Sequence, residues 1–139
     1  SIEAAAMGDF EAASDSFDFT YSIDGGPMMD LFISSVDESG SQTYTLEGGF
    51  MDTLNDPLAL NGTFLDNEFQ EIAASILGTG DELTIQFTAT TDGGSEAFAF
   101  DSLQIFGTAA AVPEPASLAM WSLLGTAIAG FGIYRFKRR

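Results

Sequence analysis

Carboxylates are the side chains of this sequence that could do chemistry. The chain has 139 residues, with 21 Asp and Glu residues but no Cys and no His. The absence of Cys and His excludes disulfides, thiol chemistry and the Ser/His/Asp and Cys/His nucleophilic arrangements. Two carboxylates can catalyse glycoside hydrolysis, but so many acids would place some pair at a suitable spacing by chance. We therefore expect no enzyme activity.

The charges are strongly segregated along the chain. The basic residues are Arg135, Lys137, Arg138 and Arg139, and every acidic residue lies at or before Glu114. No Lys or Arg can neutralise the acidic body, which should repel nucleic acid and anionic lipid. Two interpretations of the charge stay open. One is solubility and adaptation to salt, and the other is specific binding of a divalent cation. Ca²⁺ is the expected cofactor because it takes only oxygen ligands.

Residues 14–107 have the pattern of short antiparallel strands separated by turns. Apolar and polar residues alternate in 17–23 and again in 83–88, while Asp24-Gly25-Gly26-Pro27 has strong turn chemistry. Segment 69–77 fits either one helical turn or a strand. The other expected strands cover residues 30–35, 42–49 and 96–106. About six strands of this kind predict an antiparallel β-sandwich, with a barrel as the alternative.

The last expected strand singles out one carboxylate. Phe98 and Phe100 share one side of the alternation, whereas Leu103 and Ile105 share the other. Either a bulge near Asp101 re-aims its side chain, or Asp101 faces inward and is buried. A buried carboxylate in a body without Lys or Arg needs backbone N–H groups, hydroxyls or a metal ion. Asp101 is therefore the candidate metal ligand.

The C-terminal region predicts a membrane-spanning helix. Residues 116–134 form an uncharged, apolar stretch, and a basic end follows at 135–139. As a helix this stretch would be about 28 Å long, close to the hydrocarbon thickness of about 30 Å. Positive residues stay cytoplasmic, so the C-terminus is expected inside and residues 1–112 outside. Residues 109–115 are expected to be a linker.

A proline-rich motif stands directly before this stretch, formed by Val112, Pro113, Glu114 and Pro115. The order of motif, apolar helix and basic end resembles the PEP-CTERM sorting signal of Gram-negative, biofilm-forming bacteria, over residues 112–139. The resemblance implies that exosortase is the partner and that it acts at the motif. The precursor would then sit in the inner membrane, and the mature protein at the cell surface or outside the cell. A plain single-span anchor is the alternative.

The body also resembles a known class of domain. FDFTYSIDGG, the turn before ELTIQF, and GGSEAFAFDSLQIFG resemble the terminal part of jelly-roll domains in bacterial secreted and surface proteins, over residues 14–107. The resemblance implies a galactose-binding-like or lectin-like sandwich. It also implies structural Ca²⁺ on an acidic residue of the last strand, where Asp101 matches. Such domains often have eight or more strands, so further strands are expected to precede Ser1. Alternatively, Ser1 follows a removed signal peptide.

These observations predict four parts: an acidic β-sandwich (1–108), a linker with the Pro-Glu-Pro motif (109–115), a transmembrane helix (116–134) and a basic cytoplasmic end (135–139). The expected function is that of a non-enzymatic surface or extracellular-matrix protein. The alternative is a carbohydrate-binding or Ca²⁺-binding module at the end of a longer secreted enzyme, with extracellular polysaccharide as partner. A membrane-anchored enzyme is the third and least favoured class. Glycan-binding sandwiches present exposed aromatics, and the body has only Tyr21 and Tyr44 besides its phenylalanines.

Overall fold

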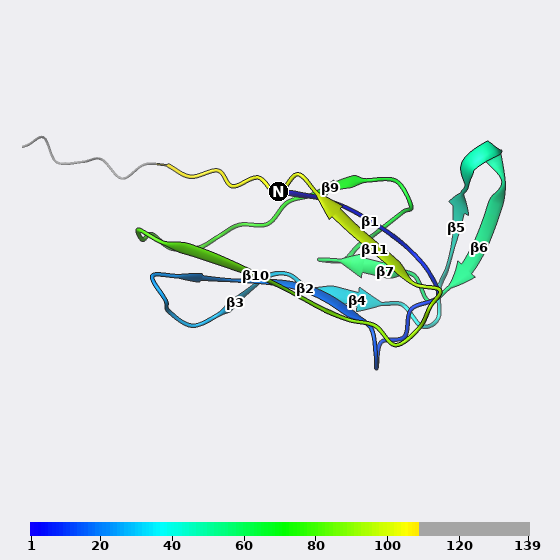
Figure 1. Ribbon diagram of the computed structural model, residues 1–139, viewed down its shortest axis with the longest axis horizontal. Coiled ribbons are helices and arrows are strands. Elements are labelled where there is room, and N and C mark those ends of the chain that lie inside the picture. Colours follow the sequence, from blue (N-terminus) through cyan, green and yellow to red (C-terminus); the bar gives the residue numbers. More distant parts are fainter. Residues whose placement is uncertain (109–139) are drawn as a thin grey trace, which may run out of the picture. The chain divides into compact units, whose positions relative to one another are not determined.

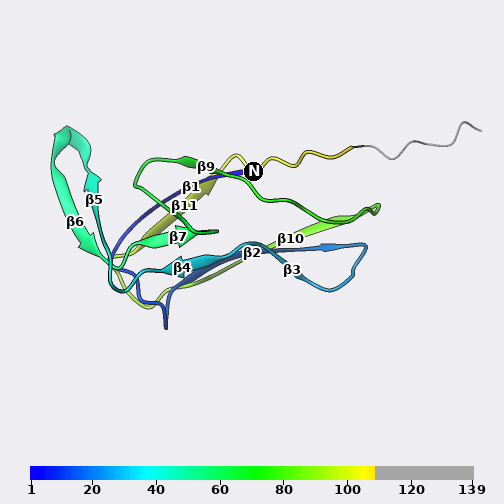
Figure 2. The same cartoon turned by 180° about the vertical axis from the view of Figure 1, so that it is seen from behind.

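The computed structural model describes residues 1–108, which fold as an all-β unit (Figures 1 and 2). Every strand pair in this part of the chain is antiparallel. Residues Ser1–Ile105 form a compact unit. The strands are β1 (Ile2–Met7), β2 (Ser16–Ile23), β3 (Met29–Phe32), β4 (Ser34–Val36), β5 (Ser41–Thr45), β6 (Met51–Asn55), β7 (Leu58–Leu60), β8 (Thr63–Phe64), β9 (Gln70–Ile72), β10 (Leu83–Thr90) and β11 (Ala97–Asp101).

Two three-stranded sheets form the layers of a sandwich-like fold. One has the order β11-β1-β9 and the other the order β10-β2-β3. Figures 1 and 2 show β1 and β11 in one layer, with β2, β3 and β10 in the other. A third, smaller sheet has the order β4-β7-β8, and β5 and β6 form a separate hairpin. The sheets therefore join strands from the beginning of the body to strands from its end.

The core lies between these layers and is rich in phenylalanine. Phe17, Phe19 and Tyr21 of β2 are 6%, 1% and 3% exposed, as their alternation in the sequence predicts. The ring of Phe17 stacks on that of Phe98 at 4.7 Å between centroids, so β11 packs onto β2. Burial of each such ring contributes roughly 1.5–3 kcal/mol to folding.

Two connections pass from one sheet to the other at the same end of the fold. Residues 8–15 lead from β1 to β2, and residues 91–96 lead from β10 to β11. Met7 pairs with Ala97 in one sheet, and Ser16 pairs with Thr90 in the other. These pairings hold both ends of the two connections side by side. We call residues 8–15 and 91–96 the two crossover segments.

The predicted last strand is corrected by the structure. It was expected to cover 96–106, but β11 ends at Asp101, because Ser102 adopts a left-handed backbone with φ 52°. The pairing of β11 with β1 runs from Ala97 to Asp101 without a register shift, so there is no bulge within it. Asp101 is exposed, and the interpretation that buried it is wrong. The change of alternation marks the end of the strand.

Other expected boundaries also change. Segment 69–77 contributes a strand at Gln70–Ile72. The strand expected at 42–49 ends at Thr45 and is followed by a 3₁₀ turn at Glu47–Gly49. The strand expected at 30–35 is divided into β3 and β4. Strands β1, β6, β7 and β8 were not expected, so residues 1–108 hold more strands than about six.

The predicted linker (109–115), transmembrane helix (116–134) and basic end (135–139) lie outside the described residues. Within residues 1–108, no helix is long and apolar enough to cross a membrane.

Candidate functional site

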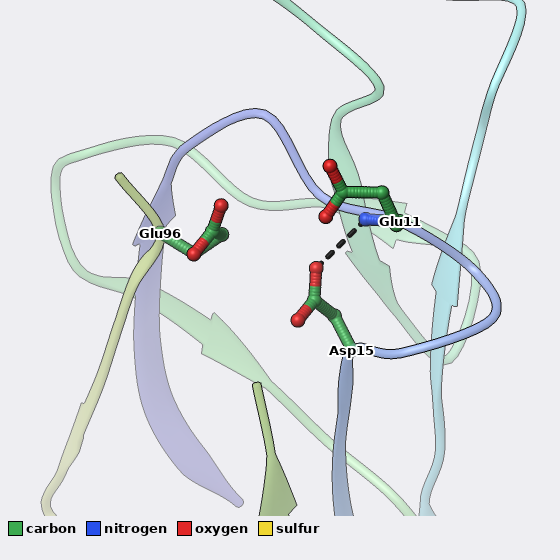
Figure 3. A group of neighbouring side chains, drawn as sticks. All are labelled: Glu11, Asp15 and Glu96. Atoms are coloured by element: carbon green, nitrogen blue, oxygen red, sulfur yellow. Dashed lines mark hydrogen bonds between the residues drawn. The ribbon is translucent and has the colours of Figure 1, made fainter. Parts of the chain in front are cut away.

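Three carboxylates converge where the two crossover segments meet, and we call them the carboxylate triad (Figure 3). Glu11 and Asp15 come from the first crossover segment, Asp15 being the last residue before β2. Glu96 is the last residue before β11. One oxygen from each carboxylate lies within 4.8 Å of the other two. Residues 81 positions apart are thus joined by the topology of the two sheets.

A tight turn presents the two acids of the first crossover segment. The Glu11 carbonyl accepts hydrogen bonds from the N–H groups of Ser14 at 3.1 Å and Asp15 at 2.8 Å. In return the Glu11 N–H donates to Asp15 Oδ2 at 2.7 Å, the bond drawn in Figure 3. These bonds fix the Asp15 carboxylate relative to the backbone of Glu11. Its orientation is therefore set before any ligand arrives.

Asp15 is the buried member of the triad. Its side chain is only 6% exposed, and Oδ1 has no hydrogen-bond donor within residues 1–108. An unpaired buried polar atom costs about 1–3 kcal/mol, and more when it is charged. The side chain points toward Glu11 and Glu96 (Figure 3). The unpaired oxygen thus belongs to a carboxylate that faces two other acids.

Glu96 is held in place by short-range contacts. Ser95 Oγ donates to Glu96 Oε1 at 3.0 Å, and Thr91 Oγ1 donates to Oε2 at 3.4 Å. Glycines allow the close approach of the backbone, since a Cβ added at Gly8 would lie 2.7 Å from the Glu96 Cα. A Cβ at Gly93 would overlap the Glu96 carboxylate oxygens. A glycine in each crossover segment therefore leaves room for Glu96.

The triad concentrates negative charge. The pKa of Glu11 is raised above its ordinary value of 4.5, first by a hydrogen bond shared with the Asp15 carboxyl and then by partial desolvation. The charges of Asp15, Asp92 and Glu96 raise it further. No Lys, Arg or His occurs in the first 134 residues to offset these charges. Three carboxylates without a basic neighbour suit a hard cation, which takes oxygen ligands.

Asp101, the ligand expected from the sequence, lies elsewhere on the fold. It stands at the far end of β11 from Glu96, which is about 16 Å away at the rise of an extended strand. It pairs with Glu3, and its Oδ1 accepts the N–H of Ser102 at 2.7 Å. The structure therefore does not bring Asp101 into the triad. The sorting motif, Val112 to Pro115, lies outside the described residues.

Sequence reasoning missed all three members of the triad. One sequence pattern could have indicated two of them. An acid stands directly before each of two strands in which large and small or polar residues alternate, Asp15 before β2 and Glu96 before β11. Their proximity depends on the pairing of β1 with β11, and β1 was not expected as a strand.

Comparisons with known protein families, with curated proteins and with solved structures find no match to this chain.

Proposed function

We propose that this chain is an exported bacterial surface or extracellular-matrix protein, sorted through a C-terminal PEP-CTERM signal that exosortase processes. One observation carries the proposal: a Pro-Glu-Pro motif, an uncharged apolar stretch and a basic end follow one another within residues 112–139. In the proposal residues 116–134 span the inner membrane, with the C-terminus in the cytoplasm. The acidic body stays outside and acts as a structural or binding module.

We also propose that the body is a jelly-roll-like sandwich. The pairing of β1 with β9 and β11, and of β2 with β10, supports this assignment. Jelly rolls are double-sheet folds built from Greek keys, in which strands distant in the chain lie side by side. The expected Ca²⁺ ligand Asp101 retains an exposed carboxylate, so it stays a candidate for a surface cation.

A carbohydrate-binding module is the second candidate function. Tyrosines commonly stack on sugars, but Tyr21 and Tyr44 are 3% and 0% exposed and belong to the interior. The large exposed aromatics of residues 1–108 are phenylalanines, among them Phe50 and Phe69. The burial of both tyrosines supports a structural role over the binding of extracellular polysaccharide.

The sorting proposal is tested by following the tail in cells. The full chain is expressed with and without exosortase, and the surface-released protein is analysed by mass spectrometry. We expect no peptide from residues 120–139 in the released form. Glu114→Ala should block processing and leave the chain in the inner membrane. Glu68→Ala removes an exposed acid of the body and should process normally. An intact tail on protein released in the presence of exosortase would overturn the proposal.

A further inference from the structure

We propose that Glu11, Asp15 and Glu96 bind a Ca²⁺ ion that fastens the two crossover segments, and thereby the two sheets, to each other. The proposed site lies away from Asp101 and from the sorting motif. It does not depend on how the protein is sorted.

The first support is geometric. The three carboxylates offer oxygens that all lie within 4.8 Å of one another. Ca²⁺ binds oxygens at about 2.3–2.6 Å, so two ligands on opposite sides of one ion stand about 5 Å apart. The triad therefore already has the dimensions of a coordination shell. Since Glu11 is exposed, water can supply further ligands on that side.

The second support comes from Asp15 alone. Surface acids often gather without a function, because water solvates them. Asp15 is 6% exposed, its Oδ1 has no donor within residues 1–108, and it faces the other two acids (Figure 3). Asp15 Oδ2 accepts the Glu11 N–H, but the buried Oδ1 still needs a donor or a positive partner. The body contains no Lys, Arg or His that could supply one.

The chemistry of the triad favours Ca²⁺ over other cations. The triad offers only oxygen ligands, whereas softer metals prefer nitrogen or sulfur ligands. Mg²⁺ requires near-ideal octahedral geometry and keeps several waters, whereas Ca²⁺ accepts six to eight ligands in flexible arrangements. A site on two loops, with one buried, one half-buried and one exposed acid, fits the more tolerant ion.

The position of the site defines its effect. Each crossover segment is held at both ends by strand pairs of different sheets, Met7 with Ala97 and Ser16 with Thr90. An ion shared by both segments closes the sandwich at this end without a covalent bond. The chain has no Cys, so no disulfide can do the same. Ca²⁺ should therefore stabilise the folded body.

The test measures thermal unfolding and binding on the full chain in a nonionic detergent. Calcium chloride is titrated at constant ionic strength, set with sodium chloride, and isothermal titration calorimetry measures the affinity. Extracellular Ca²⁺ modules bind with Kd about 10⁻⁴–10⁻³ M, so 10 mM Ca²⁺ should raise Tm saturably by about 5 °C or more. Magnesium chloride at the same concentration should give a smaller rise.

Single substitutions locate the site. Asp15→Asn and Glu96→Gln should each weaken Ca²⁺ binding by at least about tenfold and remove most of the Tm rise. Glu47→Gln, on the β5–β6 hairpin, makes the same change in charge outside the triad and should keep the full response. Asp101→Asn tests the alternative ligand. Without Ca²⁺, Asp15→Asn should melt no lower than the wild type, because its amide can donate to the Glu11 carboxylate. This last result distinguishes an ion ligand from a residue that only supports the fold.

Three outcomes would overturn the proposal. Sodium chloride alone could produce the same rise in Tm, which would mean general screening of the acidic body. The triad variants could respond to Ca²⁺ as the wild type does. The response could also be lost in Asp101→Asn alone, which would place the ion at the end of β11.

Discussion

The β2–β10 ladder has an aspartate at each end, and the two carboxylates differ in their hydrogen-bond donors. At one end, Asp24 Oδ1 accepts hydrogen bonds from the N–H groups of Asp81 and Glu82, both at 2.9 Å. At the other end, Asp15 Oδ1 has no donor within residues 1–108 and faces two more acids. At the first end, backbone N–H groups satisfy the carboxylate. At the second end, in our proposal, a bound ion does so.

The difference shows what replaces salt bridges in a body without basic side chains. Asp18 follows the pattern of Asp24, because its Oδ1 accepts from the Ser34 N–H at 2.8 Å and from Ser34 Oγ at 2.9 Å. These bonds tie β2 to β4. Backbone and hydroxyl donors therefore satisfy Asp18 and Asp24. In our proposal an external cation does the same for the triad.

The largest effect is expected from a substitution of Asp24, whose carboxylate is satisfied by backbone N–H groups. Asp24→Ala removes both bonds to the turn before β10 and places alanine at a left-handed position with φ 51°. We expect a loss of about 2–3 kcal/mol in the free energy of unfolding. The loss should be the same with and without Ca²⁺. Urea denaturation measures it.

Asp24→Asn is the control for that experiment. Asparagine keeps an oxygen acceptor and tolerates the left-handed region, so it should cost less than about 1 kcal/mol. Equal losses from Ala and Asn would mean that the charge of Asp24, and not its two hydrogen bonds, holds the end closed.

A smaller effect is expected from adding a methyl group beside Glu96, at the Asp15 end of the ladder. A Cβ at Gly8 would lie 2.7 Å from the Glu96 Cα, so Gly8→Ala must displace one crossover segment from the other. Overpacking of this kind costs about 1–3 kcal/mol. The shift should also weaken the response of Tm to Ca²⁺, because it moves Glu96 away from Asp15. Thermal melts with and without Ca²⁺ measure both effects.

Gly94→Ala provides the matched control in the second crossover segment. No atom lies within 4 Å of a Cβ at Gly94, and its backbone needs no left-handed conformation. It should change stability by no more than about 0.5 kcal/mol and leave the Ca²⁺ response intact. A comparable loss from both substitutions would show that neither crossover segment tolerates alanine, rather than that Glu96 was displaced.

The sequence predicted the fold better than the triad. The alternation in β2 and β10, and the turn at 24–27, follow from local patterns and are confirmed. β1 was missed because it is the central strand of its sheet, with both faces largely buried, and its run of alanines shows no alternation. Since β1 sets the pairing that brings Glu11 toward Glu96, missing the strand meant missing the triad. A contact across 85 positions leaves no local pattern.

The smallest expected effect compares two half-buried loop acids, Asp37 and Asp56. The pKa of Asp37 is lowered from 3.8 by the Ser39 hydroxyl, at 2.8 Å, and the Ser39 N–H. The pKa of Asp56 is raised from 3.8, first by desolvation and then by the charges of Asp9, Glu38 and Asp37. One acid has donors and the other faces acids, which repeats the contrast between Asp24 and Asp15 on a smaller scale.

The two shifts predict opposite dependence on pH. A lowered pKa in the folded state stabilises the fold above pH 3.8, and this contribution disappears as pH falls through the folded pKa. A raised pKa does the reverse, so the contribution of Asp56 is present below pH 3.8 and is lost as pH rises through its folded pKa.

At pH 7, Asp37→Asn should therefore lower Tm slightly and Asp56→Asn should raise it. Asparagine also tolerates the left-handed backbone of Asp56, at φ 53°. Below about pH 3 the raised Tm of Asp56→Asn should vanish, because the wild-type carboxyl is then neutral in both states. Melting curves of the two variants from about pH 2 to pH 7, in a chelator to remove divalent cations, would test this. The same sign of change in both variants at pH 7 would show that total charge, rather than the local supply of donors, governs the stability of the acidic body.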